Sequence, residues 1–92
     1  MYRPLPKSLT IAESDIDGLG LFATENIFAK TTLGHTHYDS IDHGRVRSPL
    51  GGFINHSDNP NCFIVVETDW SRMYTVRPIM QGEELTVYYT GY

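Results

Sequence analysis

The sequence predicts one mainly β domain that spans residues 1–92. Short segments rich in β-branched and aromatic residues alternate with clusters of Gly, Pro, Asp and Asn, a pattern typical of strands joined by turns. No segment keeps the apolar period of a helix over about ten residues, so we expect one or two short helical turns at most. A chain of 92 residues has room for a single modest core.

The N-terminal part predicts a β-hairpin. Apolar residues alternate with smaller or polar ones in both of its strands, at Leu9 and Ile11 and then at Leu19 and Leu21. The turn-rich stretch 14–18 separates them. Gly18 and Gly20, at the return of the hairpin, allow a positive φ or a close approach to the backbone. Taken alone, the two glycines fit a β-bulge or a tight turn as well as a binding site.

The rest of the chain predicts further strands. Residues 32–38, rich in Thr and aromatic character, predict a third strand, and the charged stretch 39–49 predicts a surface loop. Residues 63–67 and 73–76 are the clearest strands and should pair as a hairpin. Residues 85–89 supply a last strand.

The central stretch, residues 50–62, reads L-G-G-F-I-N-H-S-D-N-P-N-C. Its polar residues cannot bury one another, and such residues normally scatter over turns. Pro60 would stop a helix or a central strand, while the Asn and Ser side chains can satisfy backbone groups where no ladder exists. The pattern favours an irregular backbone held in a fixed shape, as a ligand site needs.

The stretch Asn55-His56-Ser57, followed by Pro60-Asn61, resembles the central motif of the SET domain family of protein lysine methyltransferases. Two flanking stretches resemble further signatures of that family: Gly18-Leu19-Gly20-Leu21-Phe22-Ala23 near the start, and Gly82-Glu83-Glu84-Leu85-Thr86 with Tyr89 near the end. Each motif alone is weak, but the three stand in family order over nearly the whole chain.

The resemblance implies a fold of small antiparallel sheets with a pseudoknot-like C-terminal crossing. It implies S-adenosylmethionine as the cofactor and methylation of a lysine side chain on a protein or peptide substrate. Many SET enzymes have a zinc-binding Cys where Asp58 stands, so we expect a metal-free domain. The family's usual insert is cut to about residues 38–49, and the chain stops at Tyr92, as in short viral and bacterial SET proteins. We therefore expect a homodimer, in which a second copy completes the site.

The resemblance also assigns roles to single residues. The residues that it places at the cofactor are Gly18, Leu19, Gly20, Asn55, His56 and Tyr89. The glycine stretch would face the amino-acid end of the cofactor through its backbone, Asn55 would hold it through the side chain, and His56 would contact it near the adenine. Tyr89 would be the catalytic tyrosine. Tyr88 and Tyr92 would line the substrate channel.

Composition excludes other classes of protein. The net charge of −4 disfavours a nucleic-acid partner, because proteins that neutralise phosphates concentrate Lys and Arg. The apolar runs are too short to span a bilayer, and the first residues lack a secretory signal core. The single cysteine, Cys62, excludes an internal disulfide. These observations predict a cytoplasmic protein.

Two alternatives stay open. The first is a metal site built from imidazoles and carboxylates, for which the candidate ligands are His35, His37, Asp39, Asp42 and His43. Alternation along a strand would put His35 and His37 on one face. The second alternative is a non-catalytic SET-like module that binds a peptide or the cofactor without turnover.

Overall fold

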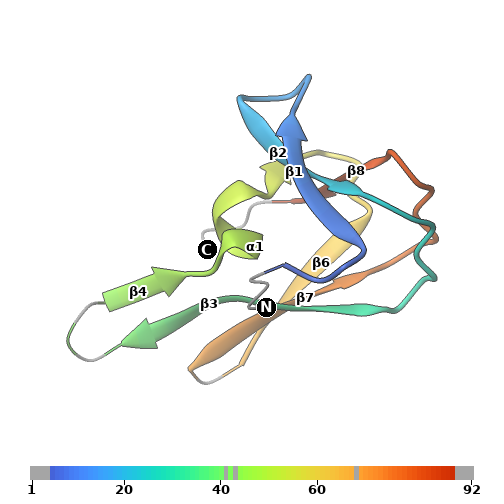
Figure 1. The fold of residues 1–92 in the computed structure, drawn as a ribbon. Coiled ribbons are helices and arrows are strands. Elements are labelled where there is room, and N and C mark those ends of the chain that lie inside the picture. The colour runs from blue at the N-terminus through green and yellow to red at the C-terminus, as the bar shows by residue number, and fades with distance from the viewer. Residues whose placement is uncertain (1–4, 41, 43, 68, 89–92) are drawn as a thin grey trace.

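The computed structural model describes residues 5–40, 42, 44–67 and 69–88, which form two four-stranded sheets and one short helix (Figure 1). The first sheet has the order β1 (Leu9–Glu13), β2 (Leu19–Ala23), β8 (Glu84–Val87) and β5 (Asn55–His56). The second has the order β4 (Gly44–Arg47), β3 (Thr32–Ser40), β7 (Trp70–Thr75) and β6 (Cys62–Val66). The helix α1 spans Pro49–Phe53. The predicted mainly β class is confirmed.

Both predicted hairpins are present. β1 and β2 pair antiparallel from Leu9 opposite Ala23 to Glu13 opposite Leu19. β6 and β7 pair antiparallel from Cys62 opposite Thr75 to Val66 opposite Ser71. The third predicted strand is β3, which continues to Ser40 and pairs with β7.

The prediction of a loop over residues 39–49 was wrong. Residues 44–47 form β4, which pairs antiparallel with residues 37–40 of β3. Gly44, with φ of 69°, supplies the left-handed backbone at the start of β4 that a side chain would resist. β4 is four residues long and partly exposed, so it carries no apolar alternation that a pattern could detect.

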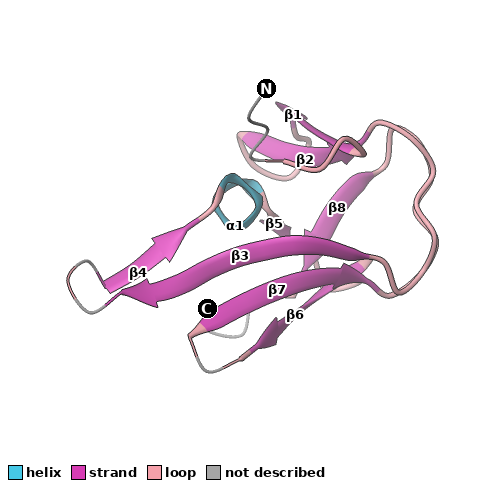
Figure 2. Cartoon of the chain, turned by 60° about the horizontal axis from the view of Figure 1, so that its bottom comes forward, coloured by secondary structure: helices cyan, strands magenta, loops and turns pink. Residues whose placement is uncertain are grey.

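The helix α1 begins directly after β4. The Ser48 hydroxyl accepts a hydrogen bond from the Gly51 backbone N–H at 3.3 Å, and Pro49 takes the first helical position, where its missing N–H costs nothing. Gly51 lets the helix lie close to β3, because a Cβ there would overlap the Thr36 carbonyl. In Figure 2, α1 lies between the β1–β2 hairpin and β3.

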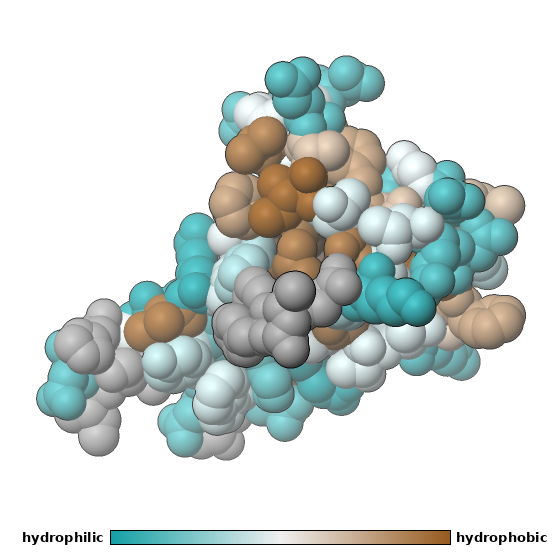
Figure 3. Space-filling view, in the orientation of Figure 1, coloured by the Kyte–Doolittle hydropathy of each residue, from teal (hydrophilic) through white to brown (hydrophobic). Residues whose placement is uncertain are grey.

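The core joins the two sheets and the helix. Its completely buried members include Leu21, Met73, Ile79, Leu85 and Val87. On the face shown in Figure 3, apolar side chains also gather over the β1–β2 hairpin, where Ile11 and Leu19 are partly exposed. In the part of the chain that the structure describes, no helix has the length and apolar character to cross a bilayer.

Candidate functional site

The first sheet brings the three sequence motifs together. β5 runs parallel to β8, with Asn55 opposite Thr86 and His56 opposite Val87. The Ser57 backbone N–H extends this pairing by donating to the Val87 carbonyl at 2.9 Å. On its other side, β8 pairs with β2, which carries the glycine motif. The central motif is therefore not wholly irregular, since its first two polar residues are held in a sheet.

The side-chain amide of Asn55 lies in a cluster of oxygen atoms. Its Nδ2 is 2.9 Å from Glu84 Oε2 and 3.1 Å from the Ser14 hydroxyl. The same nitrogen is 3.1 Å from the Asp17 carbonyl and 3.3 Å from the Leu19 carbonyl. We call these four acceptors the oxygen cluster. Asn55 thus ties β5 to the turn of the first hairpin and to β8.

Glu84 and Asn55 fill the space above Gly20. A Cβ at Gly20 would overlap the Glu84 carboxylate and would lie 3.0 Å from Asn55 Nδ2. The Glu84 carboxylate also accepts a hydrogen bond from the Ser14 hydroxyl at 2.8 Å. The glycine is therefore required by the chain's own side chains in this structure. Asn55, Ser14 and Glu84 together form the polar floor of the candidate site.

The hairpin turn presents backbone carbonyls to this floor. Gly18 adopts φ of 44°, in the left-handed region that favours glycine, and its carbonyl accepts from the Ser14 N–H at 2.9 Å. The Ser14 hydroxyl accepts from the Ile16 N–H at 3.0 Å. These local bonds fix the turn, so the Asp17 and Leu19 carbonyls are held in place rather than free to turn toward solvent.

His56 directly follows Asn55 in β5. Its Nε2 is 3.0 Å from the exposed Asp58 carboxylate, and its ring centroid is 4.8 Å from that of Tyr88 at 55°. Tyr88 is half exposed and follows the buried Val87 at the end of β8. Tyr89 and Tyr92, predicted as the catalytic tyrosine and a channel residue, lie outside the described residues.

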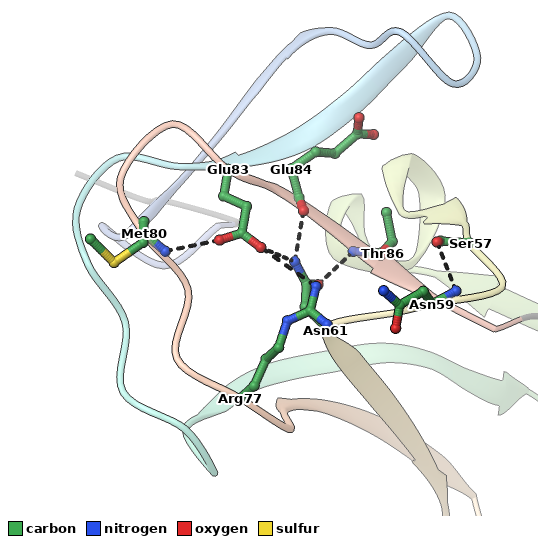
Figure 4. A network of polar contacts seen from close by, with 8 residues as sticks. All are labelled: Ser57, Asn59, Asn61, Arg77, Met80, Glu83, Glu84 and Thr86. Carbon is green, nitrogen blue, oxygen red and sulfur yellow. Dashed lines mark hydrogen bonds and ion pairs between the residues drawn. The ribbon is translucent and has the colours of Figure 1, made fainter.

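A buried side-chain amide, that of Asn61, is hydrogen-bonded to the backbone of β8 (Figure 4). Asn61 accepts from the Thr86 N–H at 2.9 Å and donates to the Glu84 carbonyl at 2.8 Å. Its Nδ2 also donates to the Glu83 carboxylate at 3.1 Å, which in turn lies 3.8 Å from Arg77. Asn61 therefore fixes the backbone of β8 at the two residues beside Asn55.

The geometry does not favour the alternative metal site. A register shift between His35 and His37 breaks the alternation of β3, so Thr36 and His37 are both buried while His35 is exposed. His37 contacts the Ser71 hydroxyl at 2.7 Å, and His35 packs its ring 4.7 Å from Trp70. Among the described residues, which do not include His43, no three His, Cys, Asp or Glu side chains gather as metal ligands. His35 and His37 nevertheless line one pocket, together with Tyr38 and Trp70.

Sequence reasoning missed two residues of the polar floor. The sequence pattern indicates Ser14 only as part of a turn, and Glu84 only as part of the terminal signature. Glu84 lies just before the predicted last strand, and only the structure shows it to be a partly buried carboxylate that needs a polar partner. The partner itself lies 70 positions away in the chain, and only the fold reveals it.

Comparisons with known proteins agree on one family. The model of the SET domain family matches residues 35–90. The histone-lysine N-methyltransferase MEDEA of Arabidopsis thaliana is 26% identical, and a histone-lysine N-methyltransferase of Aspergillus oryzae, described as H3 lysine-4 specific, is 30% identical. The alignments cover 86% and 90% of this chain but only 16% and 10% of those relatives, which are much longer.

Solved structures show the same fold at low identity. A histone methyltransferase candidate from Plasmodium falciparum superposes with a TM-score of 0.76 at 19% identity, over 95% of this chain and 96% of its own. The methyltransferase domain of human PR domain-containing protein 2 gives a TM-score of 0.72 at 19% identity, over 96% and 80%.

Proposed function

The chain belongs to the SET domain family, and on that premise we propose that it methylates a lysine side chain of a protein or peptide with S-adenosylmethionine as the donor. One observation carries the proposal: the pairing of β2, β8 and β5 sets the glycine motif, the terminal motif and Asn55-His56 beside one another. Two of the matched relatives are named histone-lysine N-methyltransferases, which supports a lysine substrate.

The polar floor fits the amino-acid end of the cofactor. An α-amino group needs hydrogen-bond acceptors, and the oxygen cluster offers two backbone carbonyls, a hydroxyl and a carboxylate around Asn55. The rings of His56 and Tyr88 lie 4.8 Å apart and are tilted by 55°, and an aromatic face of this kind suits a flat base such as adenine. The turn that contains Gly18 presents the Asp17 and Leu19 carbonyls to this floor.

When bound, the cofactor would supply a methyl group on a sulfonium. A neutral amine could attack this methyl carbon in line with the bond to sulfur. The chain must hold the two reactants in line and exclude water, and orientation with fixed dipoles can provide most of the acceleration. We assign the orientation of the amine to the Tyr89 hydroxyl, by resemblance to the family. Transfer would form the N–C bond at the expense of the sulfur–carbon bond, which would leave a neutral thioether and a methylated ammonium that can lose its proton after release.

Mass spectrometry tests the proposal directly. Incubation of the protein with isotopically labelled S-adenosylmethionine and an extract should give a peptide with a labelled lysine. Asn55→Ala serves as the matched control that lacks the central contact. No label on any lysine, with an intact fold and demonstrated cofactor binding, would favour the non-catalytic binding module instead.

The predicted homodimer stays a prediction, which light scattering at micromolar concentration can test. A clean monomer mass together with tight cofactor binding would contradict it.

A further inference from the structure

The oxygen cluster holds more acceptors than Asn55 can satisfy. The side-chain amide has two N–H bonds, whereas four oxygens lie within 3.3 Å of its nitrogen. Each hydrogen is therefore shared, and the two carbonyls and the carboxylate keep capacity for another donor, whereas the Ser14 oxygen already accepts from the Ile16 N–H as well. A ligand that donates several hydrogen bonds at once matches this surplus.

The Glu84 carboxylate adds a negative charge to the cluster. Among the residues that the structure describes, its hydrogen-bond donors are neutral, namely the Ser14 hydroxyl and the Asn55 amide. The ion pairs between described residues use other carboxylates, as in Glu67 with Arg72 and Glu83 with Arg77. Glu84 is partly buried, so water screens its charge less than that of an exposed side chain.

We propose that Glu84 is the residue that recognises the α-ammonium group of the cofactor, and that it also holds Asn55 in position. This inference rests on the proposed function. An ammonium group has three N–H donors and one positive charge, which suit the spare acceptors of the Asp17 and Leu19 carbonyls and the charge of Glu84. The terminal signature then contributes to cofactor selectivity as well as to the sheet.

Calorimetry with two ligands tests the inference. S-adenosylhomocysteine carries the α-ammonium group, and 5′-methylthioadenosine lacks the whole amino-acid end. Glu84→Gln keeps the shape of the side chain and can still accept from Asn55, but it removes the charge. We expect about a tenfold or greater loss of affinity for S-adenosylhomocysteine and less than a twofold change for 5′-methylthioadenosine. Asp15→Asn, on the turn of the first hairpin, is the control for the loss of a solvent-exposed negative charge near the site and should change both affinities less than twofold.

The other outcomes separate the role of Glu84 from the proposed function. Unchanged S-adenosylhomocysteine affinity in Glu84→Gln would refute the role of Glu84 while leaving the proposed function intact. An equal loss for both ligands, or a loss for Asp15→Asn as large as that for Glu84→Gln, would also refute recognition of the ammonium group by Glu84. No binding of either ligand by the unaltered protein would overturn the proposed function, and the inference with it. Thermal melting without ligand checks that the variants are folded.

Discussion

The Asn55 amide nitrogen lies 2.9 Å from the Glu84 carboxylate, although 29 positions separate the two residues in the chain. This contact joins the central motif to the terminal motif through side chains, where β5 and β8 already join them through the backbone. Both residues also bond to Ser14, in the turn of the first hairpin. A substitution of Asn55, Glu84 or Ser14 should therefore disturb the contacts of the other two residues.

Replacing Asn55 tests the centre of that floor. Asn55→Ala should lower the affinity for S-adenosylhomocysteine about tenfold or more, because it removes a partly buried amide worth on the order of 1 to 3 kcal/mol. Calorimetry measures the change. Asn59→Ala, at an exposed position of the same motif, is the matched control and should leave the affinity unchanged. Equal affinities for all three proteins would contradict the assignment of Asn55.

Replacing Gly20 tests the space that Glu84 and Asn55 occupy. Gly20→Ala should displace the Glu84 carboxylate and weaken cofactor binding, since the new Cβ would overlap it. Gly52→Ala is a suitable control, because nothing lies within 4 Å of its Cβ position and alanine favours the helix that contains it. Calorimetry and thermal melting on both variants separate the two effects. Tight binding by Gly20→Ala would show that the floor adapts.

The sequence predicted most strands because their patterns are local. Alternation predicted β1 and β2, and β-branched runs predicted β6 and β7. β4 was not predicted because its pairing with β3, and not its own composition, makes it a strand. The bulge between His35 and His37 was not predicted for a related reason, because a register shift depends on the partner strand β7.

The site was only partly predictable. Resemblance picked out Asn55, His56 and the glycine motif, and the fold brings them together on one sheet. The contacts of Ser14 and Glu84 required the tertiary structure, because they span 70 positions.

The two neighbouring tyrosines should differ in their effects. Tyr89→Phe should reduce methyl transfer much more than cofactor affinity, because the proposed role of its hydroxyl concerns the reacting amine. Tyr88→Phe should matter less, since phenylalanine retains the ring that lies 4.8 Å from the His56 ring. Single-turnover kinetics and calorimetry give the two readouts. Greater damage at Tyr88 would reverse the assignment.

Cys62 should make stability depend on alkaline pH. Burial raises the pKa of its thiol to about 12, against a smaller lowering by Arg77. The unfolded chain releases this proton near pH 9, so the free energy of unfolding should fall as pH rises from about 9 toward 12, by about 1.4 kcal/mol per pH unit. Urea unfolding of the unaltered protein and Cys62→Ala, compared from pH 8 to 10, isolates this slope. Parallel pH profiles for the two proteins would argue against a buried, protonated thiol.

Asn61 should be the most sensitive polar residue of the core. Asn61→Ala leaves the buried Thr86 N–H and the Glu84 carbonyl without their partner, so we expect a loss of about 2 to 3 kcal/mol in the free energy of unfolding. N61D keeps an oxygen for Thr86 but places a second carboxylate beside Glu83, whose oxygen lies 3.1 Å from the Asn61 nitrogen.

The like charges of N61D should raise the pKa of the introduced carboxyl group above its unfolded value. A raised folded-state pKa gives stability that is present at low pH and is lost as pH rises, so the difference between N61D and the unaltered protein should shrink from pH 7 to pH 4. Asn59→Asp, which places the same charge at an exposed position, should show no such recovery. Urea denaturation at both pH values measures all three proteins. If N61D loses as much stability at pH 4 as at pH 7, then the lost hydrogen bond to the Glu84 carbonyl, and not repulsion by Glu83, governs this position.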